Sequence, residues 1–113
     1  MRARYINKGN VSYTASLDDV VIALCKDYGR REDIVNRSGC TERTAIEYRY
    51  LNYRIREAAE EIAGERYAMP FIEDIGKSIG YARTEMSGFC EADYKSTKRA
   101  VKLGLARSLH LLD

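Results

Sequence analysis

REDIVNRSGCTERTAIEYRY, residues 31–50, predicts a short helix, a turn and a second helix. Gly39 supplies the turn because glycine tolerates a left-handed backbone. Cys40 is small and apolar, as a buried anchor under the turn should be, and Thr41 is placed to cap the free amides of the second helix. The side chains expected to be buried between these helices and the preceding one are Ile34, Ala45 and Tyr48.

This pattern resembles the helix-turn-helix superfamily of DNA-binding proteins. The resemblance implies that the second helix enters the major groove of DNA. The residues that would then face the groove are Thr41, Glu42, Arg43, Ile46, Glu47 and Tyr50. The sequence departs from the family at Val35, where alanine or glycine is usual because the second helix passes close. Glu42 and Glu47 could accept hydrogen bonds from cytosine, but they oppose the phosphate attraction that dominates affinity.

A second stretch, residues 72–89, resembles the half-motifs of two-motif regulators. Gly76 falls at the position of close approach and Gly80 at the turn. The residues expected to be buried after that turn are Tyr81, Met86 and Phe89. The alternative is one continuous helix from Pro70 to Ser87, in which the two glycines let a neighbouring helix pack close.

The composition of the whole chain agrees with a small helical protein. Its 113 residues suit one domain, and 45% hydrophobic with 32% charged residues describe an ordinary globular chain. A single proline and many Glu, Arg, Lys, Ala and Leu residues favour an all-α bundle of four or five helices with a helix-turn-helix-like core. Within the single domain 1–113 we expect an extended arm or small hairpin at 1–15, the helix-turn-helix-like unit at 16–64 and C-terminal helices at 70–112.

The first and last helices are predicted from apolar spacing and from capping residues. Ser16 is the expected N-cap of the first helix and Gly29 its stop. Its apolar side is expected to hold Leu17, Val20, Val21, Leu24, Cys25 and Tyr28. The last helix is expected to run from Asp93 to about Leu112, with inward side chains Tyr94, Val101, Leu105 and Leu112.

The helix that begins at Thr41 is expected to reach Ala63, to end at Gly64 and to carry two apolar stripes. The main stripe is Tyr48, Leu51, Ile55, Ala59 and Ile62. The second stripe, on nearly the opposite side, is Ile46, Tyr50 and Tyr53. Such a helix either lies between two packing partners or leaves one face for a partner outside the chain.

Basic residues cluster on the last helix, although the chain has a net charge of only +2. Eleven Lys and Arg oppose seven Asp and Glu in residues 1–56, three oppose eight in 57–92, and five oppose two in 93–113. Lys95, Lys98, Arg99 and Lys102 share one side of a helix. They could contact nucleic-acid phosphates or an acidic protein surface, or form a solvated face.

Metal, cofactor and catalytic patterns are not found in the sequence. Cys25, Cys40 and Cys90 are widely spaced and predict free thiols in a reducing cytoplasm, and His110 is the only histidine, so no metal site is expected. Ser108 and His110 would point to different sides of a helix, and no glycine-rich phosphate loop occurs, so we expect no cofactor and no enzyme. The longest apolar run is too short for a membrane span, and the N-terminus lacks the apolar core of a signal peptide, so we expect neither a membrane span nor secretion.

Together these observations predict a cytoplasmic DNA-binding regulator that acts as a homodimer, since one short motif gives limited specificity. Arg43, Ile46, Glu47 and Tyr50 would face bases, while the four cations of the last helix neutralise phosphates. The alternative is a non-enzymatic protein-binding module or an inhibitor of phage or mobile-element type, such as an anti-defence protein. The acidic groove-facing residues and the stripe Ile46, Tyr50 and Tyr53 favour that alternative. A third possibility is RNA binding through the C-terminal basic face.

Overall fold

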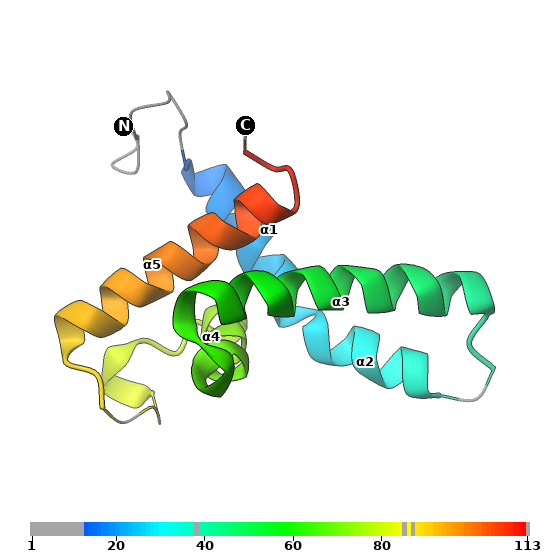
Figure 1. Cartoon of the computed structure of the whole chain (residues 1–113), viewed down its shortest axis with the longest axis horizontal. Helices are drawn as coiled ribbons and strands as arrows, with labels where there is room; N and C mark the ends of the chain where they lie inside the picture. The colour runs from blue at the N-terminus through cyan, green and yellow to red at the C-terminus, as the bar shows by residue number, and fades with distance from the viewer. Residues whose placement is uncertain (1–12, 38, 85, 87, 113) are drawn as a thin grey trace.

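The computed structural model describes residues 13–37, 39–84, 86 and 88–112, which form helices and no strand. The predicted all-α fold is thereby confirmed (Figure 1). The elements are α1 (Ala15–Lys26), α2 (Tyr28–Asn36), α3 (Glu42–Ala63), α4 (Glu65–Lys77), the 3-10 helix η1 (Tyr81–Arg83) and α5 (Glu91–Ser108). The expected arm or hairpin lies outside the described residues up to residue 12, and Tyr13, which follows, belongs to the core.

The first helix begins and ends earlier than predicted. Thr14, and not Ser16, is the N-cap, because its hydroxyl accepts the amide hydrogen of Leu17 at 3.1 Å. The chain bends at Asp27 and enters α2 at once, so Gly29 lies inside α2 and does not stop a helix. Val20, predicted on the apolar side of α1, is 45% exposed.

The turn and both ends of α3 are confirmed. Gly39 has a φ of 94°, in the left-handed region that glycine tolerates. Thr41 caps α3 by accepting the amide hydrogen of Thr44 at 3.2 Å. Gly64, with a φ of 86°, ends α3 and is the single residue between α3 and α4.

The predicted helix from Pro70 to Ser87 is wrong at both ends. Gly64 turns the chain directly into α4, so Pro70 lies inside this helix. The helix ends at Lys77 because Ser78 adopts a left-handed conformation, with its amide donating to the carbonyl of Ile75. Only the three residues of η1 are helical between α4 and α5 in the described chain, so the second helix expected within 72–89 is not formed.

Gly76 is a point of close approach, as predicted, and its neighbour is α1. A Cβ added at this glycine would lie 2.8 Å from the backbone nitrogen and Cα of Lys26. Real Cβ atoms do not approach backbone so closely, so only glycine fits where α1 crosses α4. Gly80 has no such contact, and its φ of 82° instead serves the turn after α4.

The last helix begins at Glu91 with Cys90 as its N-cap, so Asp93 lies in its first turn and is not the cap. It ends at Ser108, short of the predicted Leu112. Three of its predicted inward residues are buried, namely Tyr94, Val101 and Leu105.

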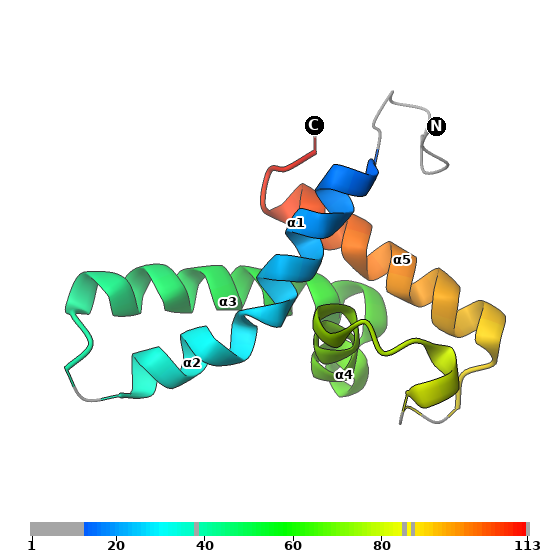
Figure 2. The ribbon, with the colours of Figure 1, turned by 180° about the vertical axis from the view of Figure 1, so that it is seen from behind.

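The core lies where α1, α3, α4 and α5 meet. Its largest fully buried apolar side chains are Tyr94, Phe71, Ile55, Ile72, Ile75, Leu105, Val21 and Val101. In both views α2 and the first half of α3 extend away from this core (Figures 1 and 2). We call α2 together with residues 42–53 of α3 the hairpin arm.

Because Cys25 is buried, we expect the stability of the protein to fall at alkaline pH. Burial raises the pKa of this thiol from 9.0 to about 12. The neutral thiol therefore contributes stability below pH 9.0 that is lost as the pH rises towards about 12. We expect the urea midpoint of the wild-type protein to fall over this range. In a Cys25→Ala variant the midpoint should fall only at the higher pH where Tyr28 and Tyr94 ionise, because burial raises their pKa values from 10.0. An unchanged pH profile in the variant would contradict this role of Cys25.

Candidate interaction surface

The hairpin arm places α2 along one side of α3. The amide of Asn52 donates to the carbonyl of Tyr28 at 3.1 Å, which joins the start of α2 to the middle of α3. The end of α2 connects through residues 37–41 to the start of α3. The predicted order of helix, turn and helix is therefore present, with α2 antiparallel to the first half of α3.

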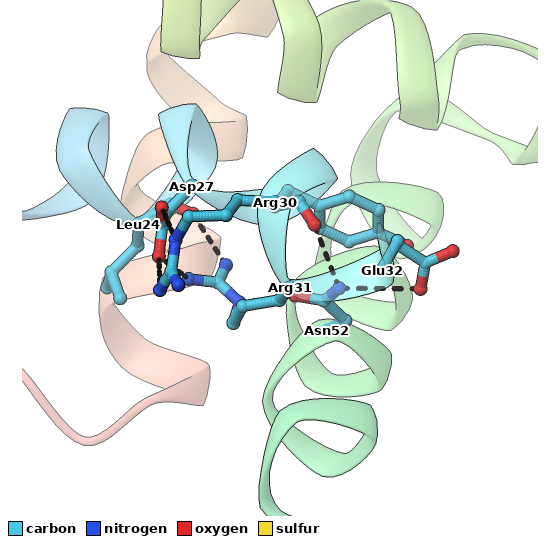
Figure 3. Close-up of polar contacts among 7 residues, drawn as sticks. Leu24, Asp27, Arg30, Arg31, Glu32 and Asn52 are labelled. Carbon is cyan, nitrogen blue, oxygen red and sulfur yellow. Dashed lines mark hydrogen bonds and ion pairs between the residues drawn. The ribbon is translucent and has the colours of Figure 1, made fainter. Parts of the chain in front are cut away.

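A buried polar network holds this arrangement (Figure 3). Arg31 is only 3% exposed, and its guanidinium donates to Asn52 Oδ1 at 2.7 Å and to the carbonyl of Leu24 at 2.6 Å. It also pairs with Asp27 at 3.3 Å, which in turn holds the exposed Arg30 at 2.6 Å. Burial lowers the pKa of Arg31, while the hydrogen bond from Arg30 lowers that of Asp27. The network ties the end of α1, α2 and α3 together.

The opposite side of α3 is exposed. Ile46 is 58% exposed, Tyr50 60% and Tyr53 59%, so no described part of the chain covers the second apolar stripe. We call this surface the α3 face and define it as Arg43, Ile46, Glu47, Tyr50, Tyr53, Arg54 and Glu57. The predicted partner-binding residues of this helix are thus brought together on one uncovered surface.

Ion pairs and hydrogen bonds within the helix orient the polar groups of the α3 face. Arg43 pairs with Glu47 at 3.3 Å, and the Tyr53 hydroxyl donates to Glu57 at 3.0 Å. That hydrogen bond raises the pKa of Tyr53. Arg54 donates to the Tyr50 hydroxyl at 2.7 Å and also to the backbone carbonyl of Ser108, which links the face to the end of α5. Both tyrosine rings are therefore held by charged neighbours one turn away.

The other predicted contact residues line a groove beside α5. Lys95, Lys98, Arg99 and Lys102 share this groove of about 260 Å³ with Tyr13, Gly80, Tyr81 and Tyr94. The prediction that the four cations lie on one side of a helix is confirmed. The aromatic residues of the groove come from other elements as well, which spacing along α5 alone does not indicate.

Carboxylates of other helices pair with the two most buried cations of this groove. Lys98 lies 2.6 Å from Asp74, and Lys102 lies 3.0 Å from Asp18. Asp74 is 1% exposed and also accepts the Tyr94 hydroxyl at 2.6 Å. Burial and this hydrogen bond raise the pKa of Tyr94. Lys98 and Lys102 therefore already hold α5 to α4 and α1.

Other candidate chemistry is limited in the described chain. A cavity of about 460 Å³ is lined by Met69, Pro70, Asp74, Lys77, Arg83 and Met86, but its buried carboxylate is the one already bound by Tyr94 and Lys98. No group of three or more His, Cys, Asp or Glu residues that could hold a metal occurs among the described residues. The three cysteines are free. No described helix is long and apolar enough to span a membrane.

Comparison with known proteins gives no match: no family model, no curated protein and no solved structure is similar to this chain.

Proposed function

We propose that the protein is a non-enzymatic binding module that docks onto a protein partner through the α3 face. The observation that carries this proposal is the exposed row of Ile46, Tyr50 and Tyr53 in the first half of α3. Tyrosine and arginine are enriched among residues that dominate protein interfaces, and Arg43 and Arg54 flank this row. An amphipathic helix presenting such residues at spacings of three and four is a common recognition element. Three free thiols suit a reducing compartment, and we place the protein in the cytoplasm.

The same geometry gives weaker support to DNA recognition. Helix-turn-helix proteins set their two helices at a steep angle, whereas α2 lies along α3 here. Glu42, Glu47 and Glu57 would approach phosphates together with the helix. At least three of the four groove cations already pair with carboxylates: Lys95 with Glu91, Lys98 with Asp74 and Lys102 with Asp18.

A DNA-binding regulator is the second candidate, favoured by the gathering of four cations and three tyrosines in one groove. In that case Arg43, Ile46, Glu47 and Tyr50 would face bases, and the groove would lie against phosphates. Binding would then weaken steeply with salt, because each phosphate contact releases counterions.

Site-specific photocrosslinking in cells separates the two candidates. Replacing Tyr50 or Tyr53 with the photocrosslinker p-benzoylphenylalanine should give protein adducts of one defined mass, because both side chains face outward in the exposed row. The matched control is the same replacement at Lys77, exposed on α4, which should give none. A second substitution, Ile46→Asp, should reduce the adducts at least tenfold without changing the helical circular dichroism signal.

The opposite result would favour DNA. It consists of no adduct from the α3 face, together with binding to a mixed-sequence duplex that falls with salt. Replacement of both Lys95 and Arg99 with alanine should then remove duplex binding. These two are the appropriate groove cations for this test, because Lys98 and Lys102 pair with carboxylates of other helices and so also hold the fold.

A further inference from the structure

We infer that the occupant of the α3 face is a second copy of this chain, with the two α3 helices antiparallel and their two-fold axis beside Tyr50. The inference rests on the proposed function and names its partner.

The spacing of the exposed residues fits a helix–helix seam. Ile46, Tyr50, Tyr53 and Glu57 are separated by four, three and four residues, so they recur along one side of the helix. At 100° per residue they lie within an arc of about 60°. A narrow seam of this kind fits another straight helix better than a broad surface.

The charges on the α3 face select the antiparallel orientation. With Tyr50 opposite its own copy, Arg43 lies opposite the second copy's Glu57, and Ile46 lies opposite its Arg54. Glu47 then lies opposite Tyr53 and one residue from the second copy's Arg54, so both arginines have an acidic neighbour. In a parallel pair Arg43 would face Arg43 and Glu57 would face Glu57, which opposes association.

The α3 face is free along the length that such a pairing needs. α2 packs on the far side of α3 through Asn52, Gly104 of α5 packs against Ile62 of the main stripe, and the end of α5 meets the α3 face at Arg54, which donates to Ser108. The helix has 22 residues, which span about 33 Å. Residues 42–58 of the two α3 helices can therefore lie alongside each other in opposite directions.

The area available matches a small dimer interface. A tyrosine can bury ~150–250 Å², so the exposed parts of Ile46, Tyr50 and Tyr53 in two copies offer roughly 700 Å². A specific interface needs about 1,000 Å² in total. The stems of Arg43, Glu47 and Arg54 lie beside the apolar row and supply the remainder.

The hairpin arm also gains support from a second copy. Only four described side chains of the hairpin arm are buried, and two of them are polar: Tyr28, Arg31, Ala45 and Asn52. Two helices with so small an apolar contact are poorly stabilised by themselves. Pairing two arms along α3 would give each one a second apolar contact.

Cysteine crosslinking tests the register. In a background with Cys40→Ser and Cys90→Ser, Tyr50→Cys should form a disulfide-linked dimer under mild oxidation, because it meets itself at the axis. The matched control Ile46→Cys should not, since the two copies of that residue would be separated by about 12 Å along the helices, and disulfides need Cα atoms within about 7 Å. Crosslinking at Ile46→Cys but not at Tyr50→Cys would overturn the register.

Exchanging the charges of Arg43 and Glu57 tests whether the partner is a second copy of this chain. Arg43→Glu and Glu57→Arg should each raise the dimer dissociation constant at least tenfold in sedimentation equilibrium. The double variant should recover most of the lost dimer affinity. Circular dichroism checks that all three remain helical. A monomer at every concentration, or a double variant no better than the singles, would overturn the inference.

The two proposals fail separately. If the wild-type chain is monomeric yet position 50 photocrosslinks to a different protein, the second copy is excluded as occupant and the protein-binding function stands. If neither self-association nor a protein adduct is found, both proposals fall.

Discussion

Arg31→Ala is expected to lower the free energy of unfolding by about 3 kcal/mol. The substitution leaves Asn52 Oδ1 and the carbonyl of Leu24 without the donor that now satisfies them, and each buried orphan costs ~1–2 kcal/mol. The lost packing of the arginine stem adds to this cost. For a domain whose total stability is of the order of 5–15 kcal/mol, such a loss is large. Urea unfolding followed by circular dichroism measures it.

Arg30→Ala is the matched control for this prediction. Arg30 pairs with the same carboxylate at 2.6 Å, but its side chain is 53% exposed, so its removal should change stability little. In Arg31→Ala, hydrogen exchange should quicken first in α2 and the start of α3, because the network joins those segments. Equal effects of the two alanine variants would show that burial of Arg31 does not stabilise the hairpin arm.

Gly76→Ala is expected to destabilise the protein by about 2 kcal/mol or more, although alanine is the better helix former. The new Cβ would meet the backbone of Lys26 at 2.8 Å and that of Cys25 at 2.9 Å. Backbone atoms in a packed helix cannot move aside as the end of a flexible side chain can, so α1 must shift away from α4. Thermal and urea unfolding would both report the loss.

Gly29→Ala is the same chemical change, but it is expected to change stability in the opposite direction. Gly29 lies inside α2, and a methyl group added there would have no neighbour within 4 Å, so the substitution should stabilise by ~0.5–1 kcal/mol. A stabilising effect at Gly76 would mean that α1 and α4 are not in contact at this glycine.

Local signals account for the parts of the fold that can be predicted. Gly39, Thr41 and Gly64 determine the boundaries of α3 through their own backbone or side-chain chemistry, so these boundaries can be recognised in the sequence. Pro70 is misleading because proline is frequent in a first turn, yet here Gly64 starts the helix a turn and a half earlier. The left-handed Ser78 that ends α4 has no sequence signal comparable to a glycine.

The candidate site is only partly predictable for a related reason. Helical spacing identifies the row of Ile46, Tyr50 and Tyr53, but its exposure depends on where α2, α4 and α5 pack. Spacing likewise places Lys98 and Lys102 on one side of α5, whereas their partners Asp74 and Asp18 come from distant helices. Ion pairs between helices depend on tertiary packing, and the spacing of residues along one helix does not indicate which residues of other helices lie nearby.

The crossing of α1 over α4 has a consequence for synthesis on the ribosome. Helix α1 is made first, yet the residue that fits against its end, Gly76, is added some fifty residues after Cys25. Asp18, in the first turn of α1, can form its ion pair only after Lys102 has been translated. The nascent α1 therefore lacks its packing surface at a stage when α3 and α4 can already contact each other around Gly64. Although α1 is synthesised first, we expect it to be among the last helices to dock.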